Sequence, residues 1–328
     1  MSADWKLRPE GGGRFALGLI HNVVRYGGRT VGRALLYPIT LYFLMVRALE
    51  RRESRNYLAR VLPTPPRLID VARHIHTFAA TILDRVFMLT GQMQHFDIEV
   101  RGMDQLHAAL DQGRGVMLFG SHLGSFDALR ALSRARPDVQ VRVLLDRAHN
   151  PMIAATLDAL NPELAAGVID AGQDGTSIVL AIKQATDEGA LVALLVDRAR
   201  SGESSLDVPF LGGMAAFPTA PWLIAAVLKV PVVLAFGLYR GGNRYELVFE
   251  GFSDGVDVPR AQRPTMLATL VARYAARLQH HTHSAPYNWF NFFPFWNADA
   301  EDSTPVVDPV AADGQSGSQC VGGRRDGV

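Results

Sequence analysis

The sequence predicts an α/β fold in which a mostly parallel central sheet is flanked by helices and follows an N-terminal helical region. From residue 96 onward, short apolar β runs alternate with helical patterns, which is typical of such a sheet. Before that point, apolar residues recur mainly at helical spacing. A chain of 328 residues with 48% hydrophobic content can form one large domain with appendages. We expect a helical region at 1–95, an α/β domain at 96–298 and a disordered tail at 299–328.

Residues 34–46 form an uncharged apolar run between Arg33 and Arg47. A membrane-spanning helix needs about 20 residues, and Pro38 is expected to kink a helix here. The run therefore favours a segment that lies in one leaflet of a membrane, with a buried core helix as the alternative. Because the run starts late and no small-residue cleavage site follows it, we expect no cleavable signal peptide and a location on the cytoplasmic side.

The net charge of +1 hides an uneven distribution. Residues 1–60 hold 11 Lys or Arg against 4 Asp or Glu. A basic, apolar end without long basic runs predicts an anionic membrane surface as partner, and not nucleic acid. The only cysteine, Cys320, lies in the Gly/Ser-rich tail, which excludes an intramolecular disulfide framework and a cysteine-based zinc site.

A Pro-rich breaker at 63–66 precedes a helical pattern over 67–92. Strands are expected at 98–100, 115–119, 139–145, 168–170, 191–196, 232–238 and 245–250. Helices are expected at 103–112, 126–135, 150–160, 176–188, 216–229 and 264–283.

The most informative segment follows the strand 115–119, where a turn containing Ser121 carries His122 and then Asp127. Open α/β sheets bind ligands beyond the carboxyl ends of their strands. On one continuous helix the two side chains would lie about 140° apart, so they meet only if His122 precedes the helix. Asp127 would then reach an imidazole nitrogen, fix the tautomer and make His122 a general base for a hydroxyl or an amine. The alternative is that His122 caps a helix and Asp127 is solvated.

The segment 121–127 resembles the His-x4-Asp block of the lysophospholipid and lipid A late acyltransferases. Within that superfamily, roughly residues 15–297 are most similar to the predicted acyltransferases found with aryl-polyene and xanthomonadin-type pigment genes. The blocks that carry this likeness are Tyr42-Phe-Leu, Arg51-Arg-Glu-Ser-Arg-Asn-Tyr-Leu58, Gly189 to Arg198, Pro209-Phe-Leu-Gly-Gly213 with Phe217-Pro218, and Ala285 to Trp296. The resemblance implies a glycerolipid-acyltransferase-like fold, with His122 and Asp127 as the base pair for direct acyl transfer.

Further residues are implied by the same resemblance. Arg147 and Asn150 stand where lipid A enzymes have Tyr-Arg-Pro followed by Asn, which makes them candidate acceptor contacts. Asp146 and Ala148 replace the flanking Tyr and Pro. This departure argues against lipid A itself as the acceptor.

Asp197 and Arg198 follow the strand 191–196 at the same edge of the expected sheet. The resemblance implies that Asp197 is a site residue, and the guanidinium of Arg198 is suited to hold a phosphate or carboxylate. A surface ion pair is the alternative for each of the candidate arginines. Ser121 and Gly124, in the turn after the earlier strand, complete the candidate substrate contacts.

The resemblance implies an acyltransferase that moves a fatty or polyene-like acyl group from an acyl-carrier-protein or coenzyme A thioester to a lipid or glycolipid. We expect it at the cytoplasmic face of the bacterial inner membrane, as a peripheral or monotopic protein. No cofactor and no metal are expected, because the thioester supplies the leaving group. N-acyl transfer, lipid or thioester hydrolysis and non-enzymatic lipid binding stay open. The aromatic cluster 289–296 is expected to fill the core in preference to lining an acyl groove.

Overall fold

The structure is a computed structural model that describes residues 27–130, 139–199, 202–255 and 260–296. The expected tail 299–328, with Cys320, lies outside the described residues, as do four of the eleven basic residues of the N-terminal end and part of the helix expected at 126–135.

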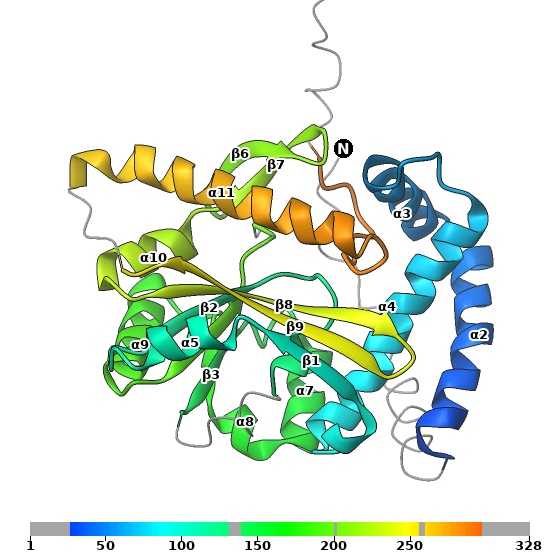
Figure 1. Cartoon of the computed structure of the whole chain (residues 1–328), viewed down its shortest axis with the longest axis horizontal. Coiled ribbons are helices and arrows are strands. Elements are labelled where there is room, and N and C mark those ends of the chain that lie inside the picture. The colour runs from blue at the N-terminus through cyan, green and yellow to red at the C-terminus, as the bar shows by residue number, and fades with distance from the viewer. Residues whose placement is uncertain (1–26, 131–138, 200–201, 256–259, 297–328) are drawn as a thin grey trace, which may run out of the picture.

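A seven-stranded sheet forms the centre of the molecule, in the order β1-β9-β8-β2-β5-β3-β4 (Figure 1). Its strands are β1 (Asp97–Arg101), β2 (Val116–Gly120), β3 (Val141–Leu145), β4 (Val168–Asp170), β5 (Leu191–Leu195), β8 (Val232–Gly241) and β9 (Arg244–Ser253). Strands β8, β2, β5, β3 and β4 run parallel to one another. Strand β9 is antiparallel to β8, and β1 pairs with β9 in parallel. The predicted α/β fold with a mostly parallel sheet is therefore confirmed.

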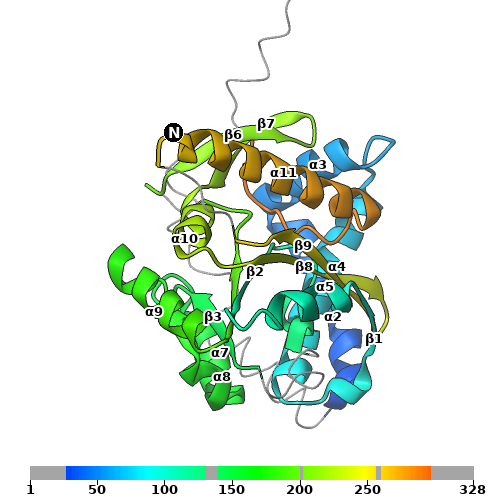
Figure 2. The same ribbon diagram turned by 60° about the vertical axis from the view of Figure 1, so that its left-hand side comes forward.

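Helices cover both faces and one end of the sheet. They are α2 (Gly28–Val46), α3 (Ala48–Val61), α4 (Leu68–Leu89), α5 (Met103–Leu110), α7 (Pro151–Leu160), α8 (Pro162–Ala166), α9 (Gly175–Asp187), α10 (Ala220–Leu228) and α11 (Arg263–Ser284), with 3-10 turns η2 (Met93–His95), η3 (Phe126–Arg130) and η4 (Arg260–Gln262). Figure 1 shows α2, α3 and α4 grouped at one end, and Figure 2 shows α7, α8 and α9 gathered beside β3.

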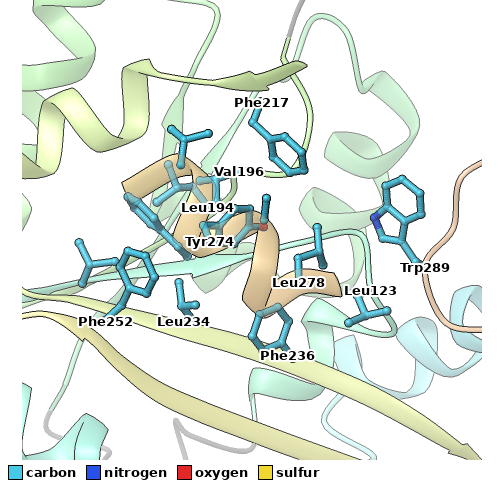
Figure 3. Close-up of a cluster of buried hydrophobic side chains, with 14 of the residues drawn as sticks. Leu123, Leu194, Val196, Phe217, Leu234, Phe236, Phe252, Tyr274, Leu278 and Trp289 are labelled. Atoms are coloured by element: carbon cyan, nitrogen blue, oxygen red, sulfur yellow. The ribbon is translucent and has the colours of Figure 1, made fainter. Parts of the chain in front are cut away.

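The sheet separates two apolar cores. Met117 and Phe119 of β2 belong to one core, and Val116 and Leu118 belong to the other, because successive strand side chains point to opposite faces. Figure 3 shows the first core, where Tyr274 and other side chains of α11 lie on the sheet. Helix α4 contributes side chains to both cores, so the N-terminal helices are joined to the sheet through it.

One hairpin was not foreseen. Strands β6 (Ser205–Phe210) and β7 (Gly213–Pro218) form a separate antiparallel pair, so the helix expected from residue 216 begins only at Ala220. Leu211 and Gly212 form the two-residue turn, and both have a positive φ, 49° at Leu211 and 75° at Gly212. The buried rings of Phe210 and Phe217 pack edge to face and join the hairpin to the first core.

Helix α2 contains the predicted apolar run and continues through Pro38 without a break. The chain bends by 96° between α2 and α3. No single helix in the described part of the chain has the length and apolar character to cross a membrane, although α2 and α3 pass that test as a bent pair. Most apolar side chains of the run are exposed, including Tyr37, Leu41 and Met45, which rules out a buried core helix.

Candidate active site

The register of two neighbouring strands brings His122 and Asp197 together. Parallel strands β2 and β5 pair Gly120 with Leu195. His122 and Asp197 each lie two positions after this pair, so they leave the two strands side by side at the carboxyl edge of the sheet. The His122 Nδ1 lies 2.8 Å from Oδ1 of Asp197, and the His122 backbone N–H donates to Oδ2 at 3.0 Å. One carboxylate thus holds both the ring and the backbone of the histidine.

These contacts fix the tautomer of His122. An ionised carboxylate only accepts hydrogen bonds, so Nδ1 carries the proton and Nε2 keeps its lone pair. Nε2 makes no hydrogen bond to the described residues, and 38% of the His122 side chain is exposed. The arrangement leaves a basic nitrogen open to an incoming substrate.

The charges around the pair favour a neutral histidine beside an anionic aspartate. Desolvation lowers the pKa of His122, and the Arg198 guanidinium lowers it further, against the opposing effect of Asp197. Burial would raise the pKa of Asp197, but the effects of the His122 imidazole and the Arg198 guanidinium outweigh it and hold that pKa well below its usual range. His122 is therefore unprotonated, and able to accept a proton, at neutral pH.

The expected pairing of Asp127 with His122 is wrong. Asp127 lies in η3, and its Oδ2 accepts a hydrogen bond from Arg85 Nε of α4 at 2.6 Å. No hydrogen bond joins Asp127 to His122 in the described structure. The physical reason is that Asp197 already occupies Nδ1, while the short η3 turn directs the Asp127 carboxylate toward α4. Asp127 acts on the site through Arg85, whose charge also lowers the pKa of His122.

The turn after β2 is held by its neighbours. Gly124 has a φ of 74°, and a Cβ there would lie 2.0 Å from the backbone oxygen of Gly237 in β8. Ser121, immediately before His122, is buried. The predicted substrate contact at Gly124 is thus a place where only glycine lets the turn approach β8.

Arg147 and Asn150 follow β3, which is separated from β2 by β5, so they lie at the same edge but further along it. Arg147 forms an ion pair with Asp158, with N–O distances of 2.6 and 2.8 Å. The Nδ2 of Asn150 donates to the backbone oxygen of Asp146 at 3.0 Å. For Arg147 the structure therefore shows the ion pair that the sequence leaves open as the alternative to an acceptor contact.

Arg198 lies against the C-terminal aromatic segment. Its Nη2 donates to the backbone oxygen of Phe290 at 2.6 Å, and its guanidinium lies 4.8 Å from the ring centroid of Phe293. It also stands 3.8 Å from Asp197. The guanidinium is therefore part of the wall of the site and partly committed to backbone contacts.

Two contributors to the site were not foreseen. Trp289 donates its indole N–H to Oδ2 of Asp197 at 3.0 Å, and Arg85 holds Asp127. Trp289 belongs to the aromatic cluster. The expected place of that cluster in the core is confirmed for Trp289 and Phe290, which are buried, whereas Phe292, Phe295 and Trp296 are partly buried and pack against the core. Nothing in the sequence signals that the chain after α11 returns to the end of β5, because no local spacing connects the two segments.

No group of three or more His, Cys, Asp or Glu side chains in the described ranges could hold a metal ion. The functional groups at this edge are thus an aspartate-held histidine, two arginines and backbone groups of the turn. They place a neutral histidine with a free ring nitrogen at the carboxyl edge of an α/β sheet.

Residues 20–297 match the family model of the bacterial lipid A biosynthesis acyltransferases. Because the match covers most of the chain, the protein belongs to this family, and the predicted resemblance to that superfamily is confirmed. A search of curated proteins gives no significant match. Family membership establishes an acyltransferase of lipid biosynthesis and favours association with a membrane. The closer likeness to the pigment-associated enzymes stays a prediction.

Proposed function

We propose that the protein transfers a fatty or polyene-like acyl group from an acyl-carrier-protein or coenzyme A thioester to a lipid or glycolipid acceptor. The observation that supports this most is the His122–Asp197 pair, which leaves one imidazole nitrogen open in a chain of the acyltransferase family.

The proposed chemistry is direct transfer. As the acceptor hydroxyl approaches the thioester carbonyl carbon, Nε2 of His122 takes its proton, and the oxygen forms the new ester bond. The carbon–sulfur bond breaks, and the departing thiolate takes the proton back from the imidazolium. Asp197 stabilises the transient imidazolium, since its carboxylate is ionised and already bound to Nδ1.

Asp127 has a less direct part in this proposal. It neutralises Arg85, whose positive charge lies near enough to lower the pKa of His122. Arg198, 3.8 Å from Asp197, is placed to attract an anionic group of a substrate.

The proposed location is the cytoplasmic face of the bacterial inner membrane. Helix α2 presents exposed apolar side chains along its length, and the arginines at 52 and 55 of α3 are exposed nearby. Apolar contact with acyl chains combined with basic contact to anionic lipid is the pattern of an interfacial helix.

The test is an incubation of purified protein in mild detergent with a labelled acyl thioester and a total bacterial lipid extract. The wild type should move label into a new lipid, and His122→Ala should lower the rate by about a hundredfold or more. Thioesters of carrier protein and of coenzyme A are compared in parallel.

His149→Ala is a matched control. His149 also binds an aspartate, with Nδ1 2.8 Å from Oδ2 of Asp146, and 80% of its side chain is exposed. This variant should transfer label at the wild-type rate. Label released only as free acid would indicate a hydrolase, and equal activity of His122→Ala and wild type would refute the proposed base.

A further inference from the structure

We propose that Trp289 is a positioning residue, whose indole N–H locks the Asp197 carboxylate in the orientation that keeps His122 in its Nδ1–H tautomer. This inference rests on the proposed function for its effect on turnover. Its structural part, the tautomer of His122, is measurable without any substrate.

The two oxygens of Asp197 have different partners. Oδ1 accepts from the His122 ring, whereas Oδ2 accepts from the His122 backbone and from the indole N–H of Trp289, both at 3.0 Å. Asp197 and Trp289 are both fully buried, so water does not replace a lost donor. Without the indole N–H, Oδ2 loses its only side-chain donor at hydrogen-bond distance among the described residues. The carboxylate is then held by His122 alone and is less restrained from turning about its Cβ–Cγ bond.

Trp289 is itself held from behind. Its backbone oxygen lies 3.0 Å from Nε2 of His74, and Nδ1 of the same ring lies 2.8 Å from Ser54 Oγ. A carbonyl accepts, so His74 donates through Nε2 and accepts a hydrogen bond from the Ser54 hydroxyl at Nδ1. Burial lowers the pKa of His74 to about 4, which keeps this ring neutral.

The backbone around Trp289 also clasps the histidine turn. Leu123 forms a β-bridge with Trp289, and the backbone N–H of Phe290 donates to the His122 oxygen at 3.0 Å. The segment therefore reaches His122 from two sides, through its backbone and through the indole. Hydrogen bonds thus connect Ser54 of α3 to His74 of α4 and His74 to Trp289. Trp289 in turn binds Asp197, which holds His122.

The chain provides a matched control in Trp296. It belongs to the same aromatic cluster, with its ring centroid 6.0 Å from that of Trp289, and its indole N–H donates to the backbone oxygen of Phe210 at 2.8 Å. Replacing either tryptophan by phenylalanine removes one indole and one hydrogen bond from that cluster. Only Trp289→Phe removes a donor from Asp197.

The kinetic test compares these variants and a double-mutant cycle. Trp289→Phe should lower kcat about tenfold with KM nearly unchanged, and Trp296→Phe should keep the wild-type kcat. In an Asp197→Asn background, Trp289→Phe should cause no further loss, because the carboxylate it positions is gone. Independent, multiplicative losses would show that Trp289 acts without Asp197 and would overturn the proposal.

The structural test is 15N NMR of histidine-labelled protein at neutral pH, with the His122 signals assigned by their loss in His122→Gln. Wild type and Trp296→Phe should show a single Nδ1–H tautomer, whereas Trp289→Phe should show a mixture with the Nε2–H form. A single Nδ1–H tautomer in Trp289→Phe overturns the proposal, whether or not transfer is detected. If Trp289→Phe does not fold, 3-benzothienylalanine at position 289 keeps the ring shape without the N–H. A mixture of His122 tautomers in that protein supports the proposal, and a single Nδ1–H tautomer overturns it.

Discussion

At the residue scale, the chemistry depends on which carboxylate meets His122. Asp127 is five positions away in the sequence and Asp197 is 75 positions away, yet the distant one binds the ring. Strand register decides this, because β2 and β5 are parallel neighbours that end together. The sequence placed both His122 and Asp197 at this edge, but spacing along the chain could not show which side chains face each other.

Gly124 gives a prediction about stability. Gly124→Ala should destabilise the protein by roughly 3 kcal/mol, because the new Cβ would lie 2.0 Å from the Gly237 oxygen at a φ that disfavours a side chain. Urea unfolding measures the change. Gly113→Ala is the control, since Gly113 has a φ of 70° but nothing within 4 Å of an added Cβ, and it should cost about 1 kcal/mol. Equal losses in both variants would contradict the close approach at Gly124.

His74 gives a prediction about pH. Its pKa falls from 6.5 to about 4 on folding, so the unfolded chain binds the extra proton as pH drops below 6.5. The stability that a neutral, buried His74 provides is full above pH 6.5 and is lost toward pH 4, by about 2 kcal/mol between pH 7 and pH 5.

Urea unfolding at the two pH values checks this. His74→Gln should be less stable than wild type at pH 7 but lose about 2 kcal/mol less on acidification. His149→Gln, which alters an exposed histidine, should follow the wild type. A His74→Gln protein that loses as much stability as the wild type between these pH values would show that His74 is not the group that titrates.

At the element scale, α2 is fastened to the rest of the protein by buried charge. Asp84 of α4 is fully buried and accepts from Arg29 at 2.8 and 3.0 Å and from the Tyr245 hydroxyl of β9 at 2.8 Å. Arg33 of α2 stands 3.5 Å from the same carboxylate. This cluster fixes one face of α2 on α4 and the sheet, so its opposite face is left outward.

The outward face of α2 gives a prediction about membrane binding. Met45→Glu should weaken binding to vesicles of anionic phospholipid, because it places a charge where apolar contact with lipid is proposed. Co-sedimentation with the vesicles measures the bound fraction. The control is Leu180→Glu on α9, since Leu180 is 60% exposed and Met45 is 70% exposed. Equal binding of the two variants would place the membrane contact elsewhere.

At the scale of the whole molecule, periodicity predicted most of the sheet because the strands are short apolar runs with helices between them. The β6–β7 hairpin escaped prediction, since Ala216 and Phe217 also suit the start of an apolar helix. The return of the C-terminal segment to the end of β5 could not be foreseen either. Its aromatic composition predicted burial, but only the fold shows that Trp289 is buried against a catalytic candidate.

The whole architecture, in the proposed mechanism, serves to hold one histidine with one aspartate. The most direct test compares Asp197→Asn with Asp127→Asn in the acyl-transfer assay. Asp197→Asn should lower kcat about a hundredfold or more. The His122 imidazolium loses its counter-charge in this variant, and the neutral imidazole is no longer held in one tautomer. Asp127→Asn should stay within about tenfold of wild type and shift the acid limb of the rate profile to lower pH, since an unneutralised Arg85 lowers the pKa of His122 further. A loss in Asp127→Asn as large as that in Asp197→Asn would contradict the account.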